Sequence, residues 1–124
     1  MIDSTVLIDF FRKTDKSNAR LTYLFNQFDQ LFISVVTEFE IESGVSDVHM
    51  SLWNNLMAKL TVLDFDSTTA REASRIVKEL KSKRKTMDKP DLFIAATACV
   101  HGLTLDTANK KHFQYIDALS LLAD

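Results

Sequence analysis

The sequence predicts an α/β fold, namely a single-domain, three-layer α/β/α sandwich with a mostly parallel central sheet. Short apolar segments with β-branched residues or phenylalanine occur at residues 31–34, 61–65 and 103–106, as is typical of strands. Stretches of ten or more residues with helical periodicity separate them, and such connections favour parallel strands covered by helices on both faces. The 124 residues contain no linker or internal repeat, so one domain is expected to span residues 1–124.

Each element follows from its pattern of apolar residues. Residues 1–2 are expected to be the tail end of a short first strand, and residues 118–124 are a weaker candidate for a fourth one. Apolar side chains recur at helical spacing in six segments, residues 5–12, 18–28, 35–45, 48–60, 68–83 and 90–101. The last of these is apolar nearly all round and rich in alanine, so we expect it to lie deep in the core. Pro90 in its first turn and Gly102 after its end mark its boundaries.

The composition excludes several classes of protein. Hydrophobic residues make up 46% and charged residues 26% of the chain, which is a globular balance and not a disordered one. No run of about 18 apolar residues is present, so no membrane span is expected. The first residues lack the basic lead and cleavage site of a signal peptide. The lone Cys99 lies in an apolar run, which predicts a buried thiol, a reducing compartment and therefore a cytoplasmic location.

The numbers of glycine, cysteine and histidine residues exclude two further kinds of binding site. The chain has two glycines, whereas a phosphate-binding loop of the P-loop or dinucleotide type needs several within one turn. With one cysteine and three scattered histidines, no zinc site of nitrogen and sulfur ligands can form locally. Carboxylates, in contrast, are abundant, with 17 Asp and Glu residues.

The charges are segregated along the chain. Residues 29–66 contain seven acids and one base (net −6), and residues 71–89 contain eight bases and three acids (net +5). Such runs are often solvated helix faces. The functional alternative is a phosphate-binding rim beside an acidic site.

Three or four acids at strand ends and helix starts are expected to converge where the parallel strands end, which is the edge at which such sheets bind ligands. Asp3 follows the first strand, Glu40 lies in the helix after residues 31–34, Asp91 is in the first turn of the alanine-rich helix, and Asp106 ends the strand 103–106. Each has a structural alternative. Asp3 and Asp91 (with its neighbour Asp88) suit helix N-termini, and Asp106 suits a turn.

The alternative for Glu40 is a capping box, because Thr37 and Glu40 have the required spacing. Helical geometry, with Val36 at the centre of the buried face, instead puts Glu40 beside Ser43 and Phe39 at the border of that face and turns Glu38 toward solvent. A carboxylate at such a border needs a cation or hydrogen-bond donors.

Clustered carboxylates repel one another unless a cation neutralises them. Hard oxygen ligands suit Mg²⁺ or Mn²⁺, ions that activate water and stabilise the charge of a phosphoryl transition state. A basic rim beside such a site would hold a polyanion by its backbone.

At this point the sequence resembles the PIN-domain ribonucleases, in particular the VapC-type toxins of toxin–antitoxin pairs. The resemblance rests on DSTVLIDFF, ISVVTEFEIESG and PDLFIAATACVHGLTLDTANKKHF and covers essentially the whole chain. It implies a Mg²⁺- or Mn²⁺-dependent endoribonuclease that acts as a homodimer on RNA and is paired with a cognate antitoxin, whose C-terminal segment can occupy the acidic groove. The resemblance gives Asp3, Glu40 and Asp91 the place of the metal-binding acids. It gives supporting places to the polar residues Ser4, Thr5, Thr107 and Asn109.

One position departs from the family pattern. Where the family usually has a further acid, this chain has His112, which is not a hard ligand. Asp106 or Asp88 could compensate; otherwise a second metal position is in doubt. His112 could instead contact an RNA phosphate, or be a plain surface histidine. The other residues expected to contact RNA are all basic: Lys83, Arg84, Lys85, Lys110 and Lys111.

Two other classes of function are compatible with the sequence. A phosphorelay receiver would use Asp64 or Asp66 as phosphoacceptor, although it also needs an acid pair after the first strand, where only Asp3 is found. A catalytically weakened PIN-like scaffold would act through protein or RNA binding.

Overall fold

Two short strands form the one regular sheet of the molecule. The computed structural model describes residues 1–124. Strand β1 (Leu31–Ser34) pairs in parallel with β2 (Leu60–Leu63), with Leu31 opposite Leu60. Leu31, Leu60 and the fully buried Ile33 contribute to the core. The predicted strand at residues 31–34 is confirmed, and the strand predicted at residues 61–65 begins one residue and ends two residues earlier than expected.

The other predicted strands meet their neighbours at single residues. Ile2 pairs in parallel with Asp106, and Leu105 pairs in parallel with Leu121. The backbone N–H of Ile2 also donates to the carbonyl of Phe32 at 2.9 Å, which joins this segment to β1. The parallel arrangement is therefore confirmed, but residues 103–106 and 118–124 form isolated bridges instead of strands. The first segment cannot lengthen because a helix begins directly after Asp3.

Seven α-helices and one 3₁₀ turn (Lys16–Asn18) surround the strands. The helices are α1 (Ser4–Arg12), α2 (Arg20–Gln27), α3 (Val35–Gly44), α4 (Asp47–Met57), α5 (Ser67–Ser82), α6 (Lys89–Val100) and α7 (Lys110–Phe113). All six predicted helices are present, with small shifts at their ends. Helix α7 was not predicted because four residues are too few to show a helical period.

Side-chain caps fix where helices begin. The Asp3 carboxylate accepts the Thr5 N–H at 3.0 Å at the start of α1. Helix α3 is capped by Ser34, whose Oγ accepts the Thr37 N–H at 3.1 Å. The capping box of Thr37 and Glu40 is therefore wrong, since Thr37 lies inside the helix and Glu40 is left for another role.

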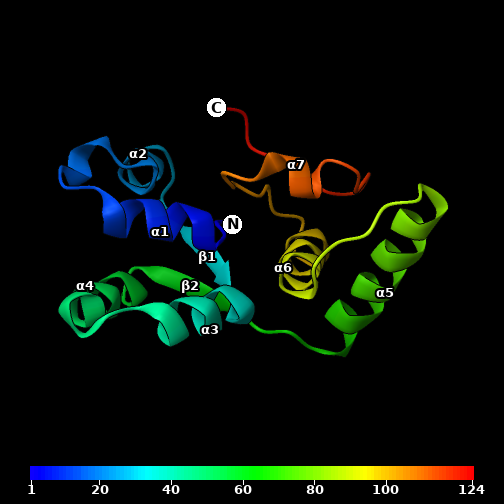
Figure 1. Cartoon of the computed structure of the whole chain (residues 1–124), viewed down its shortest axis with the longest axis horizontal. Coiled ribbons are helices and arrows are strands. Elements are labelled where there is room, and N and C mark those ends of the chain that lie inside the picture. Colours follow the sequence, from blue (N-terminus) through cyan, green and yellow to red (C-terminus); the bar gives the residue numbers. More distant parts are fainter.

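Two apolar clusters hold the fold together. The first, called here the α1 cluster, contains Ile2, Val6, Leu7, Leu21, Leu24, Leu31, Ile33, Ile41, Trp53, Leu56 and Leu60. The second, the α6 cluster, contains Met1, Ala73, Ile76, Leu80, Leu92, Ile94, Ala95, Ala96, Ala98, Leu105, Phe113 and Ile116. Figure 1 shows the same division, with α1–α4 gathered around the strands at one end and α5–α7 at the other. None of the helices has the length and apolar character needed to cross a membrane.

Helix α6 is the most deeply buried helix, as predicted, and its small residues pack against α5. Gly102 follows it with a φ of 62°, a left-handed conformation that favours glycine. The chain then turns back so that the Leu103 N–H donates to the Ala98 carbonyl at 2.9 Å. Cys99 is a free thiol and is only half-buried, and burial raises its pKa to about 11.

Candidate metal centre

Asp3 is a buried carboxylate at the start of α1, where the first strand segment ends. Its side chain is held by the Thr5 N–H at 3.0 Å and the Thr5 Oγ1 at 2.5 Å, and it also accepts a hydrogen bond from Thr107. Only 3% of the residue is exposed, and this burial raises the pKa of Asp3 above its usual value. The negative charge of Asp91 raises that pKa further. Asp3 is thus a costly buried charge without a basic partner.

Glu40 is brought to Asp3 by the residue next to Asp3 in the chain. The hydroxyl of Ser4 donates to Glu40 Oε1 at 2.5 Å, although the two residues are 36 positions apart. Glu40 is half-buried on α3 and forms no ion pair with a lysine or arginine.

The buried face of α3 differs from the predicted one by one residue. Thr37 and Ile41 are buried, whereas Phe39 is 68% exposed and Glu38 is half-buried. With Thr37 at the centre and 100° per residue, Phe39 falls opposite the core, and Glu38 and Glu40 fall on its two flanks. The solvent-facing position expected for Glu38 is therefore wrong, and Phe39 points away from the buried face instead of lying at its border. Glu40 does lie at that border, as predicted.

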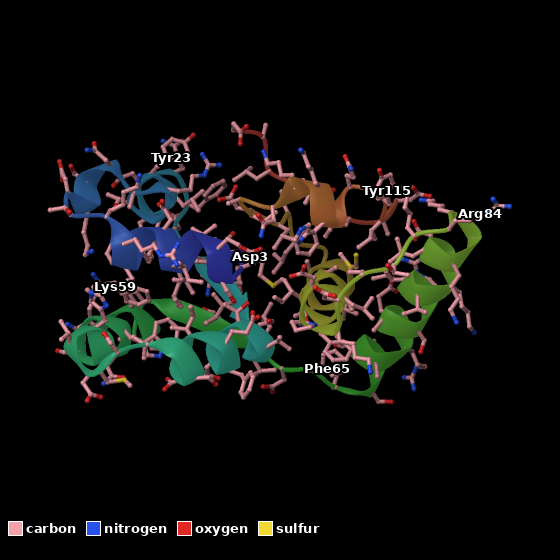
Figure 2. The ribbon with its side chains drawn as sticks, viewed as in Figure 1. Asp3, Tyr23, Lys59, Phe65, Arg84 and Tyr115 are labelled. Atoms are coloured by element: carbon pink, nitrogen blue, oxygen red, sulfur yellow. The ribbon has the colours of Figure 1, made fainter.

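Asp91 approaches from the other side, in the first turn of α6. Its Oδ2 lies 3.1 Å from Nδ1 of His112 on α7, and its side chain is half-buried. Asp3, Glu40 and Asp91, called here the acidic edge, therefore come from three different elements and are linked through Ser4 and through the electrostatic effect of Asp91 on Asp3. Figure 2 shows Asp3 near the middle of the molecule, at the end of α1 that points toward α6.

The segment around Thr107 is hydrogen-bonded to Thr5, the residue that holds the Asp3 carboxylate. Thr107 is buried, and its Oγ1 lies 3.5 Å from the Thr5 Oγ1 and accepts the Asn109 N–H at 3.0 Å. The Thr5 Oγ1 in turn accepts the Ala108 N–H at 2.9 Å. Asn109 is exposed and occupies the N-cap position of α7 without a side-chain capping bond.

Asp106 and Asp88 are engaged differently from the acidic edge. Both carboxylate oxygens of Asp106 accept hydrogen bonds from the Arg20 guanidinium, each at 3.0 Å. Sequence reasoning missed Arg20 because it lies 86 residues from its partner and belongs to no motif. Asp88 is exposed at the N-cap position of α6 and makes no side-chain capping bond.

The predicted RNA-binding bases divide into two groups. Lys83 donates to Glu79, to Asp117 and to the Tyr115 carbonyl, and Lys110 is paired with Asp124 at 2.7 Å. Lys85 lies 4.4 Å from the centre of the Tyr115 ring. Arg84 and Lys111 are exposed and form no ion pair.

The donor set fits a hard divalent cation. The acidic edge offers carboxylate oxygens whose charge no lysine or arginine neutralises, which is the environment that Mg²⁺ and Mn²⁺ require. No three His, Cys, Asp or Glu side chains lie close enough together to hold an ion by themselves. Mg²⁺ usually binds through one or two carboxylates and keeps several waters, so a closed cage of three is not needed.

Comparison of the sequence with known protein families identifies the family of this chain. The model of the PIN domain matches residues 1–119. The chain belongs to the PIN-domain family. It is 31% identical to Ribonuclease VapC1 of Methanocaldococcus jannaschii, over 98% of this chain and 83% of that protein. It is 26% identical to Ribonuclease VapC19 of Mycobacterium tuberculosis, over 91% of this chain and 90% of that protein.

Solved structures give the same fold. VapBC from Salmonella typhimurium bound to DNA matches with a TM-score of 0.87 at 24% identity, covering 98% of this chain and 95% of the matched chain. VapBC2 from Rickettsia felis, also bound to DNA, matches with a TM-score of 0.85 at 24% identity, covering 98% and 96%. The predicted PIN fold and the predicted class, a VapC-type ribonuclease, are confirmed. The phosphorelay alternative is wrong, and Asp66 instead caps α5 by accepting the Thr69 N–H at 3.0 Å.

Proposed function

We propose that this PIN domain is a Mg²⁺- or Mn²⁺-dependent endoribonuclease that hydrolyses RNA phosphodiester bonds at Asp3, Glu40 and Asp91. The observation that carries the proposal is geometric: Asp3 is only 3% exposed and has no basic partner, and the neighbouring Ser4 holds Glu40 beside it. Buried carboxylates that repel one another and have no basic partner are stabilised by a divalent cation. A bound ion supplies a nucleophile at neutral pH by lowering the pKa of its water.

The protein's own residues hold the acids in place. Thr5 and Thr107 donate hydrogen bonds to the Asp3 carboxylate, which orients it for an ion. Ser4 fixes Oε1 of Glu40 and leaves its second carboxylate oxygen without a protein hydrogen bond. Arg84 and Lys111, which carry no ion pair, are the bases best suited to hold RNA by its phosphates.

The proposal is tested by cleavage of total RNA. Purified protein is incubated with Mg²⁺, with Mn²⁺ and with EDTA, and fragments are separated on a denaturing gel. We expect cleavage by the wild type with metal, and none with EDTA or with Asp3→Asn. Asp29→Asn, a change at an exposed acid outside the site, is the matched control and should cleave normally. Cleavage that persists in both EDTA and Asp3→Asn would contradict the proposal.

The partners of the solved relatives suggest those of this chain. Structures of VapBC and of a toxin–antitoxin complex from Klebsiella pneumoniae share its fold. We therefore propose that this chain is the toxin of a toxin–antitoxin pair, that it forms a homodimer, and that the C-terminal segment of the antitoxin occupies the acidic groove. If a small protein is encoded beside it, coexpression of the two should yield a complex in which RNA cleavage is suppressed. Light scattering after size exclusion should give twice the mass of one chain.

A catalytically weakened scaffold is the second candidate, and His112 is the observation that favours it. An exposed imidazole stands where the family pattern usually has an acid. Metal titration separates the two candidates, because an ion that binds the folded state raises the melting temperature by mass action. Stabilisation by millimolar Mn²⁺ or Mg²⁺ supports the enzyme, and its absence supports the scaffold.

A further inference from the structure

His112 is the only nitrogen-bearing side chain that forms a hydrogen bond or ion pair with the acidic edge. Its Nδ1 lies 3.1 Å from Asp91 Oδ2, whereas the side-chain partners of Asp3 and Glu40 are the hydroxyl groups of Thr5, Thr107 and Ser4. The His112 side chain is 56% exposed, and its Nε2 has no hydrogen-bond partner in the protein. The imidazole is therefore accessible to an ion that binds at Asp91.

The backbone holds this imidazole in place. His112 belongs to α7, which packs on α6, the helix that carries Asp91. The neighbouring Phe113 is 1% exposed and anchors α7 in the α6 cluster. The His112 N–H donates to the Asn109 carbonyl at 2.9 Å. The two side chains thus face each other because two packed helices place them there.

Their separation suits two ligands of one ion. Ligand atoms that each lie about 2.1 Å from an octahedral ion, at right angles to one another, are about 3 Å apart. The Nδ1 to Oδ2 distance of 3.1 Å is close to this value. A cation could accept both atoms with little movement of either side chain, provided that Nδ1 gives up any proton it shares with Asp91.

An imidazole changes which cation is preferred. Mg²⁺ is hard, binds oxygen and dehydrates reluctantly, so a nitrogen ligand contributes little to its binding. Mn²⁺ shares the preference of Mg²⁺ for carboxylate oxygen, but as a first-row transition ion it accepts an imidazole nitrogen more readily than Mg²⁺ does. Building on the proposed function, we infer that His112 is a direct ligand that makes this centre select Mn²⁺ over Mg²⁺.

The test measures metal binding and not activity. Metal-free wild type, His112→Asp and His101→Asp are titrated calorimetrically with Mn²⁺ and with Mg²⁺. His101 is the matched control because it is also exposed but lies at the opposite end of α6. We expect the ratio of the Mg²⁺ to the Mn²⁺ dissociation constant to fall by about tenfold or more in His112→Asp. The ratio should be unchanged in His101→Asp.

Pulsed electron paramagnetic resonance of bound Mn²⁺ gives a second readout. Modulation by a directly bound imidazole nitrogen is expected in the wild type and in His101→Asp, and it should be lost in His112→Asp. Metal-free melting temperatures check that each variant is folded.

Two outcomes would overturn the inference in distinguishable ways. Mn²⁺ that binds without nitrogen modulation and with an unchanged selectivity ratio would show that His112 only hydrogen-bonds to Asp91. The proposed metal centre would then stand. Failure of folded wild type to bind either ion would overturn both the metal centre and the inference built on it.

Discussion

The guanidinium of Arg20 donates hydrogen bonds to both oxygens of the Asp106 carboxylate, from Nε to Oδ2 and from Nη2 to Oδ1, each at 3.0 Å. The backbone of Asp106 is hydrogen-bonded on both sides of Ile2, because its N–H donates to the Met1 carbonyl and its carbonyl accepts the Asp3 N–H. Arg20 also donates to the Ala123 carbonyl at 3.3 Å. This ion pair therefore ties α2 and the C-terminal tail to the segment that carries Asp3.

Removing Arg20 should destabilise the fold. Arg20→Ala leaves the buried Asp106 carboxylate unpaired, and we expect the free energy of unfolding in urea to fall by about 2–4 kcal/mol. This loss is smaller than the roughly 3–5 kcal/mol expected for a fully buried pair, because the Arg20 side chain is 28% exposed. Arg12→Ala, an exposed arginine without an ion pair, should change it by less than about 0.5 kcal/mol. Equal losses in the two variants would contradict a specific role of the pair.

The buried Asp3 predicts how the stability of metal-free protein depends on pH. The folded-state pKa of Asp3 is raised above its unfolded value, so its contribution is fully present below about pH 4. That contribution is lost as the pH rises through the folded pKa. Relative to Asp3→Asn, the wild type should therefore lose stability with rising pH and be less stable than the variant at pH 7.

Urea titrations in EDTA between pH 3 and pH 7 measure this difference. The Asn side chain can still cap α1, so the variant should keep the helix. Asp29→Asn should run parallel to the wild type, because Asp29 is exposed and has no hydrogen-bond partner. A stability difference between wild type and Asp3→Asn that does not change with pH would contradict the raised pKa.

The hydrogen bond from Ser4 predicts a positioning role. Ser4→Ala removes the donor to Glu40 Oε1, so we expect RNA cleavage and metal affinity to fall by about 10–100-fold with little change in melting temperature. Ser43→Ala is the matched control, since Ser43 lies on the same helix and donates only to the Phe39 carbonyl. If both variants cleave RNA like the wild type, Ser4 does not position Glu40.

Whether a lysine is already paired with an acid in the protein predicts whether it binds RNA. Lys111→Ala should weaken RNA binding and reduce the slope of log affinity against log salt by about 0.7, because it removes one phosphate contact. Lys83→Ala should leave that slope unchanged and lower stability instead, because its ammonium is held by Glu79, Asp117 and Tyr115. Fluorescence anisotropy at several salt concentrations, in the uncleaving Asp3→Asn background, measures both slopes. A slope that changes with Lys83 and not with Lys111 would reverse this assignment.

The sequence predicted the helices because their apolar period is a local property. It predicted strands 103–106 and 118–124 at greater length than the structure has, since strand length depends on how far a neighbouring segment continues. That neighbour ends at Asp3, where α1 begins, and residue composition does not record this limit.

For the site, positions in the sequence singled out Asp3, Glu40, Asp91 and Asp106, and the resemblance to the PIN-domain ribonucleases selected the first three as the metal-binding acids. The sequence could not assign the partners of the acids, because these depend on which distant elements pack together. The contacts of Asp106 with Arg20 and of Asp91 with His112 are of this kind. The one-residue rotation of α3 was missed because threonine at position 37 gives no apolar signal, although it is fully buried.

The acidic edge spans the junction of the two apolar clusters. Asp3 and Glu40 are adjacent in the chain to Ile2 and Ile41 of the α1 cluster, whereas Asp91 precedes Leu92 of the α6 cluster. A core substitution that moves one cluster against the other changes the spacing of the carboxylates without touching any of them. Core substitutions made to raise the melting temperature are therefore expected to change catalytic activity as well, unless they preserve the spacing between the two clusters.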